Sequence, residues 1–315
     1  MPLPTDTFTT YDARGNREDL SNVIYRIDPT DTPFMSNIEK VKATAVNHEW
    51  QTQTLANAST ANAVLEGDDA TTDAAIATVR LGNICQISDK VARVTGTQQV
   101  VSKAGRDDEL DYQAMLKGLE LKRDIESILL NNQAKVTGNA TTARVTAGVV
   151  SWIKTNESVG ASGVAPATAD GAATRTNGTQ RGFTEAQLKT VLQSIWTNGG
   201  DPDMIMVGAY NKQAFSTFNG RGTPMEETKT KKIVATVDVY ESDFGTLKVV
   251  ANRFQRARDC LILQMDMWAM ATLRNMREIE LAVTGDSKRR QVITEYALEC
   301  RNERASGGVF DLTTS

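Results

Sequence analysis

The stretch RDDELDYQAMLKGLELKRDIESILLNN, residues 106–132, carries the clearest helical pattern in this chain of 315 residues. Its apolar side chains recur at spacings of three, four and seven, so they share one stripe of a helix. The stripe consists of Leu110, Ala114, Leu121, Ile125 and Ile128. Acidic residues gather in the first turn, where they complement the helix dipole. The pattern predicts a helix roughly 40 Å long.

Upstream of this helix, the sequence predicts a two-stranded arm. Residues 46–54 alternate between the two faces of a strand, and strand-like runs follow at 76–87 and 91–97. Residues 55–75 are mostly Ala, Thr, Asn and Asp. A polar segment of this length between two strands suggests an arm that projects from the body and ends in a polar tip.

The N-terminal region is predicted to be an extended arm followed by one short helix. Residues 1–20 are polar, rich in Thr and Asp, and lack a periodic apolar face. Pro33 fits the first turn of a short helix, which Asp31 or Thr32 can cap.

Downstream of the long helix, the composition changes. Residues 137–182 are rich in Thr, Ala, Gly, Ser and Asn, which predicts a long, mobile surface insertion with one short packed segment around Trp152. A compact α/β pattern follows, starting with a helix that has a capping box at Thr184 and Gln187. Residues 266–274 fit a short helix or a loop, and residues 291–301 alternate as a long strand.

Residues suited to catalysis or metal binding are scarce. The chain has one histidine, His48, and strand alternation places the neighbouring Glu49 on the opposite face. The sequence contains no HExxH motif, no clustered Cys/His zinc spacing, no phosphate loop and no dinucleotide fingerprint. We therefore predict no catalytic site, no cofactor and no bound metal.

Charge, cysteine content and hydropathy argue against further classes of protein. The net charge of −4 and the pI of about 5.3 argue against a protein that grips DNA along its backbone, so any DNA contact is expected to be loose. Three widely spaced cysteines favour a reducing compartment. The N-terminus lacks a signal pattern, and no apolar run approaches the roughly 20 residues of a membrane span. These features predict a chain made in the cytosol, without a membrane partner.

Several strings resemble the major capsid proteins of tailed phages, which share the Johnson or Hong Kong phage fold. The strings are DPTDTPF at 28–34, HEW at 48–50, TGD at 284–286, EYALECRN at 295–302 and ASGGV at 305–309. The order of the parts is also similar over nearly the whole chain. None of these strings encodes a chemistry, so the resemblance depends on their order along the chain.

The resemblance implies an α+β capsid fold with five parts. They are an N-terminal arm and short helix at 1–42, an extended β-loop at 43–89, a peripheral domain with the long spine helix at 90–136, an axial α/β domain at 137–284 that contains the insert 137–182, and a strand at 285–315 that returns to the peripheral domain. It also implies self-assembly into pentamers and hexamers of an icosahedral shell around double-stranded DNA. The implied partners are further copies of the chain, a portal, a separate scaffolding protein and, in some capsids, a decoration protein.

Charged and aromatic residues on the arm and on one loop are the candidate contacts between subunits. They are Trp50, Glu66, Asp68, Asp69, Asp73, Arg80, Lys229, Lys231 and Lys232. The acidic group around Gly67 can also be read as a divalent-cation loop, although a solvated loop tip is the favoured reading. For the three lysines, a solvated loop is again the favoured reading, and a contact to an acidic neighbouring subunit is the alternative.

Three alternatives stay open on sequence alone. A bacterial nanocompartment shell, similar to encapsulin, shares the same fold. A hydrolase that uses Asp/Glu pairs would need an acidic cleft, and a tail or adhesion protein would form trimers or open tubes.

Overall fold

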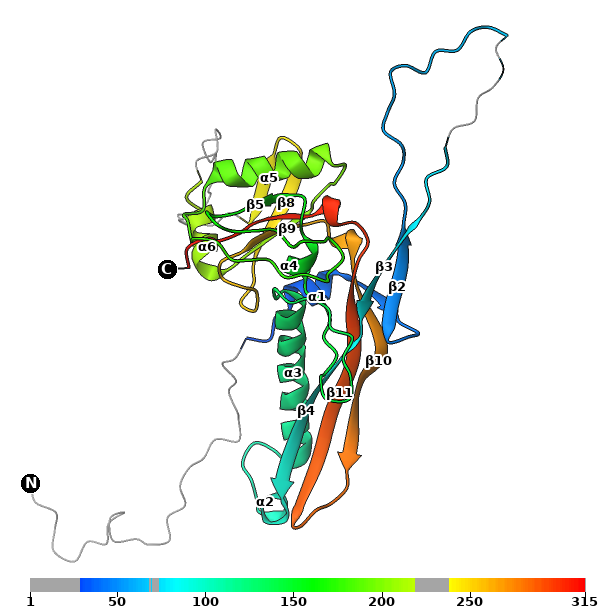
Figure 1. Ribbon diagram of the computed structural model, residues 1–315. Helices are drawn as coiled ribbons and strands as arrows, with labels where there is room; N and C mark the ends of the chain where they lie inside the picture. The colour runs from blue at the N-terminus through cyan, green and yellow to red at the C-terminus, as the bar shows by residue number, and fades with distance from the viewer. Residues whose placement is uncertain (1–28, 68, 70–73, 219–237, 315) are drawn as a thin grey trace, which may run out of the picture.

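The computed structural model describes residues 29–67, 69, 74–218 and 238–314. It shows two sheets joined by a long helix, with a hairpin arm that extends away from both (Figure 1). The predicted arm at 1–20 lies outside the described residues, as do Lys229, Lys231 and Lys232.

The long helix α3 (Glu109–Leu129) is confirmed as the spine of one domain. Asp108 caps it, since its carboxylate accepts a hydrogen bond of 2.9 Å from the backbone N–H of Asp111. The helix packs against a four-stranded sheet that we call the peripheral sheet. Its strands, in spatial order, are β1 (Glu39–Lys42), β10 (Trp268–Leu281), β11 (Ser287–Cys300) and β4 (Gln86–Thr95).

The peripheral sheet is mainly antiparallel, with β1 parallel to β10 at one edge. The predicted apolar stripe faces it: Leu121 and Ile125 belong to the same core cluster as Tyr296 and Leu298. The short helix or loop expected at 266–274 is wrong. Apart from a 3-10 turn at Met265–Met267, this stretch opens the 14-residue strand β10, which pairs with β1 and β11 and whose first residues, Trp268 and Ala269, are fully buried.

The second domain contains a six-stranded sheet, which we call the axial sheet. Its strands, in spatial order, are β5 (Glu157–Ser158), β12 (Gly307–Val309), β9 (Cys260–Leu263), β6 (Met204–Val207), β8 (Gly245–Ala251) and β7 (Val239–Ser242). Three helices accompany it, namely α4 (Val149–Trp152), α5 (Glu185–Thr197) and α6 (Ala209–Phe215). The predicted capping box is present in α5, where the N–H of Thr184 donates to the Gln187 side chain at 3.2 Å.

The predicted return strand at 285–315 implied that the C-terminal part stays with the peripheral domain. The structure shows that only its first half does. Residues 287–300 form β11 in the peripheral sheet, but the chain then crosses over and inserts β12 between β5 and β9 of the axial sheet. The alternation in 291–301 is typical of a long strand, whereas the small residues Gly307 and Gly308 carry no periodic signal. The axial domain is therefore built from two separated parts of the chain.

The short packed segment predicted around Trp152 is confirmed, since Val149, Val150, Trp152 and Ile153 are fully buried in the main core. The mobile surface insertion predicted for the rest of 137–182 is wrong in part, because Asn156 and Arg175 are buried and β5 joins the axial sheet. Its small residues permit close packing of loops: a Cβ on Gly148 would lie 2.1 Å from the carbonyl oxygen of Asn131. The low-complexity composition reflects this close approach of backbones, and it does not mark a detached segment.

Two short helices and the arm complete the fold. The helix α1 (Pro33–Asn37) is confirmed where the proline pattern predicted it, and α2 (Gly96–Val100) follows β4. The arm consists of β2 (Asn47–Thr52) and β3 (Val79–Ile84), which pair antiparallel and lead into the long loop that extends beyond both sheets (Figure 1).

Candidate assembly surface

The arm is anchored at its base by aromatic and polar contacts to the body of the same chain. The indole N–H of Trp50 donates to the backbone oxygen of Cys300 at 2.9 Å, and its ring lies 5.6 Å from that of Trp152. His48 and Glu299 share a hydrogen bond of 2.8 Å. Trp50, one of the predicted contact residues, is half-buried against its own chain, because alternation along β2 turns it toward the core.

Asn83 fixes the second strand of the arm. Its side chain is fully buried; its amide donates to the backbone oxygen of Leu298 at 2.7 Å, and its carbonyl oxygen accepts from the N–H of Ala147 at 2.9 Å. One side chain therefore ties the arm to the peripheral sheet and to the segment that leads into α4. A buried amide with these partners holds the base in one orientation.

Beyond its base, the arm is exposed. Leu55, Val64 and Leu65 expose 95%, 85% and 79% of their surface. These large exposed apolar side chains make the projecting loop a candidate contact surface. The tip that the sequence predicted as polar also carries large, exposed apolar residues.

The remaining predicted contact residues divide into three groups. Arg80 is exposed on the arm, with its guanidinium 3.6 Å from the Glu49 carboxylate. Glu66 and Asp69 are exposed at the tip. The other five fall outside the described residues: Asp68, Asp73, Lys229, Lys231 and Lys232.

The described residues hold no group of three or more His, Cys, Asp or Glu side chains that could bind a metal ion. The one histidine serves the anchor of the arm. Burial alone would raise the pKa of Glu299, but hydrogen bonds from His48 and Arg301 outweigh it and hold that pKa below its ordinary value. The pair therefore acts as a polar link between β2 and β11. In the same described part of the chain, no helix is long and apolar enough to cross a membrane.

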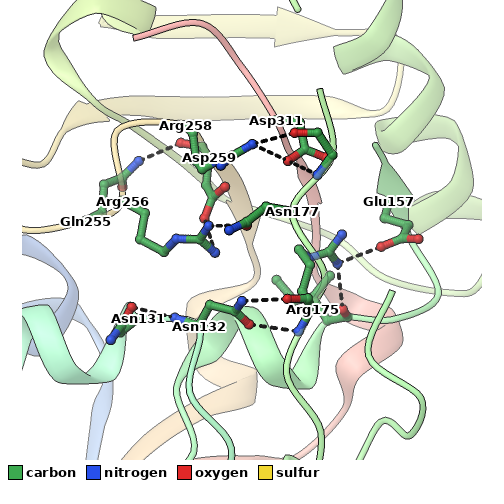
Figure 2. A network of polar contacts seen from close by, with 12 residues as sticks. Asn131, Asn132, Glu157, Arg175, Asn177, Gln255, Arg256, Arg258, Asp259 and Asp311 are labelled. Carbon is green, nitrogen blue, oxygen red and sulfur yellow. Dashed lines mark hydrogen bonds and ion pairs between the residues drawn. The ribbon is translucent and has the colours of Figure 1, made fainter. Parts of the chain in front are cut away.

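A buried polar network holds the axial domain together (Figure 2). The Arg175 guanidinium pairs with Glu157 at 2.6 Å and lies over the Phe310 ring, 3.4 Å from its centroid. Asn132, just after α3, exchanges two hydrogen bonds with the backbone of Arg175, which links the end of the spine helix to the axial domain. The network thus joins segments that are distant in sequence.

Asp311 is the centre of the same network at the C-terminal segment. It is 1% exposed and accepts hydrogen bonds from the N–H groups of Gly160 and Gly178 and from the Arg258 guanidinium, at 2.8 to 3.1 Å. Its φ of 63° lies in the left-handed region, which Asp tolerates better than most residues. Asp311 therefore secures the residues that follow β12 against two loops of the segment 137–182.

Asp259, in the same network, is expected to make stability depend on pH. Burial raises its pKa from 3.8 to about 6, although Arg256, Arg175 and Arg258 oppose the shift. The folded chain therefore binds this proton more tightly than the unfolded chain. Protonated Asp259 therefore contributes about 3 kcal/mol to the free energy of unfolding. This contribution is fully present below pH 3.8 and is lost as the pH rises through about 6.

Denaturant unfolding between pH 4 and 7 checks this expectation. Asp259→Asn should make the free energy of unfolding depend less steeply on pH over this interval than it does in the unaltered chain. The slopes are compared rather than the absolute stabilities, because the substitution also removes the 3.2 Å ion pair with Arg256. Identical slopes in the two proteins would show that Asp259 does not titrate in this range.

Sequence reasoning missed this network. Arg175 lies in the stretch taken for a surface insertion, and Asp311 lies beyond the last predicted strand. The one usable signal was the charged run Arg256, Arg258 and Asp259 directly before the apolar strand β9. Charges that border a buried strand often have partners, but the sequence does not say which segments supply them.

Comparisons with known proteins agree along the whole chain. The family model described as "SU10 major capsid protein" matches residues 4–313. A curated protein named "Major capsid protein", from Escherichia phage Phieco32, is 29% identical over an alignment of 346 residues that covers 98% of each chain.

Solved structures with a similar fold include chains from two phages and from a GTA particle. A chain from Mycobacterium phage Adephagia gives a TM-score of 0.62 at 10% identity, covering 98% of this chain and 99% of its own. A chain in "Capsid of native GTA particle computed with C5 symmetry" gives 0.65 at 8%, covering 96% and 98%. A chain from the Phage G structure of major capsid and decoration proteins gives 0.54 at 10%, covering 99% and 100%. These likenesses confirm the predicted α+β capsid fold.

Proposed function

This chain belongs to the SU10 major capsid protein family, and on that premise we propose that its β2–β3 arm lies across a neighbouring subunit of the shell. Major capsid proteins of tailed phages form the virion shell, so the function and location predicted from the sequence are confirmed. The observation that supports the arm contact is the exposure of Leu55, Val64 and Leu65 on a loop whose base is firmly anchored.

A neighbouring subunit is the natural acceptor for this loop. In a closed symmetric shell, each copy presents the same surfaces, so one arm contact is repeated around every ring and small contributions add up. The loop of residues 53–78 has too little apolar surface of its own to offset the entropy of ordering it, and a neighbour would supply the missing surface. We place this contact in pentamers and hexamers of an icosahedral shell.

Hydrogen exchange measured on soluble subunits and on assembled shells tests the arm contact. Amides of residues 55–67 should exchange fast in the subunit and at least tenfold more slowly in the shell. Strand β6, which is buried within the subunit, is the internal control and should be protected in both states. Equal exchange of the tip in the two states would overturn the proposal.

We further propose that the protein has no catalytic role and that its partners are those of a shell. Besides its own copies, these are a portal, a separate scaffolding protein, and a decoration protein of the kind named in the Phage G structure. Packaged DNA would be touched only loosely, since the chain carries a net charge of −4. A nanocompartment, a hydrolase and a tail protein are less well supported, because the family model spans residues 4–313.

The shell is expected to be non-covalent. An isopeptide cross-link from the arm requires a lysine amine, and no lysine occurs between Lys42 and Lys90. Arg80 cannot replace it, because a guanidinium stays protonated and is a poor nucleophile. Mature particles boiled in detergent with reductant should therefore run as single chains on a denaturing gel. A ladder of covalent multimers would contradict this expectation.

A further inference from the structure

A groove lined by methionines runs between the spine helix α3 and strand β10. It consists of two adjoining hollows of about 350 and 280 Å³, which share Lys122 and Met276 in their walls. Met115 and Met276 lie on its rim, 50% and 36% exposed, and buried Ile125 and Tyr296 form part of its floor. An exposed groove with flexible thioether walls is suited to take up an apolar helix face.

The chain itself contains a segment that matches this groove. Residues 1–28 lie outside the described residues, and within them Leu20, Val23, Ile24 and Ile27 follow the i, i+3, i+4, i+7 spacing of one helix face. Pro29 comes two residues after the last of them, where a helix would have to stop. As a helix, residues 17–27 would be about 15 Å long, close to the roughly 17 Å from Ala114 to Ile125 along α3.

The length of the connecting chain and the opposite charges of the two partners also favour binding of this segment in the groove. The described chain starts at Pro29, and Met35 of α1 already forms one end of the groove. Ile27 is eight residues from Met35, so it can lie anywhere within about 28 Å of that end. The rim carries Lys40 and Lys122, whereas residues 17–28 contain three acidic and two basic side chains and so carry a net negative charge. We infer that the α3–β10 groove binds residues 17–28 of the same chain as an amphipathic helix.

Methionine oxidation in the soluble subunit tests this inference without any need for shell assembly. Dilute peroxide should oxidise Met115 and Met276 at least threefold faster in a chain lacking residues 1–28 than in the full chain. Met267 lies half-buried outside the groove and is the internal control, whose rate should not change. Because only monomers are used, the result does not depend on whether the arm contacts a neighbour.

Point variants keep the inference testable if the shortened chain folds poorly. Ile24→Asp places a charge on the apolar face and should raise the oxidation of Met115 and Met276 as the deletion does. Asn22→Asp places the same charge on the opposite face and should leave both rates unchanged. Equal rates in the full chain, the deletion and Ile24→Asp would overturn the inference. Protection that appears only in assembled shells would also overturn it, because a second copy would then cover the groove.

Discussion

Removal of the arm tip, residues 55–75, is expected to leave a folded subunit that cannot close a shell. The two domains keep their cores, because Trp50, His48 and Asn83 anchor the arm below the deleted loop. What is lost is the apolar surface proposed to cover a neighbour. In a shell, this contact is repeated in every subunit, so even a modest loss per contact multiplies across the particle.

A matched pair of variants separates this effect from a change in folding. Replacing Leu55, Val64 and Leu65 by Ser should abolish shells in sedimentation and negative-stain microscopy. Replacing Ala58, Ala61 and Ala63 by Ser alters the same loop at positions that are also exposed and should allow assembly. Both proteins should unfold at the same denaturant concentration as the unaltered subunit. Normal shells from the first variant would refute the role of the tip.

Trp152→Ala is expected to be the most damaging single substitution in the segment 137–182, at about 3–5 kcal/mol of unfolding free energy. The side chain is fully buried, packs against Trp50, and lies in the core cluster that joins α3 to the axial domain. Its removal leaves a cavity where two domains and the arm meet. Denaturant unfolding of the soluble subunit measures the loss.

Val164→Ala is the control for this prediction, since Val164 lies in the same segment and is 57% exposed. It should change the unfolding free energy by less than about 0.5 kcal/mol. If the two substitutions had equal, small effects, the segment would be the detachable insertion that its composition suggested. If both were severe, the cost would not come from the core position of Trp152.

The elements with a strong periodic signal were predictable from the sequence. The stripe of α3, the alternation of β2 and β11 and the capping box of α5 each arise from local contacts repeated along one element. The packing of residues 137–182 was not predictable, because its backbone is held by distant partners such as Asn132 and Asp311. Small residues look alike in a flexible linker and in tightly apposed loops. Only the partner segments distinguish the two cases.

The candidate surface was predicted only in outline. The position of the arm follows from the strand pattern. The contacts of Trp50 with Cys300 and Trp152 do not, because they join segments that lie far apart in the chain. Leu55 and Leu65 give no sequence signal, because isolated apolar residues in a polar loop have no periodic pattern. Their significance depends on the anchored hairpin that presents them.

The late position of β12 has a consequence for biosynthesis. This strand lies between β5 and β9 in the axial sheet, yet it is translated after every other strand that the structure describes. β5 pairs only with β12 among the strands that the structure describes, so it has no partner in its sheet until residues 307–309 have left the ribosome. Polypeptides that stop early therefore keep an open axial sheet.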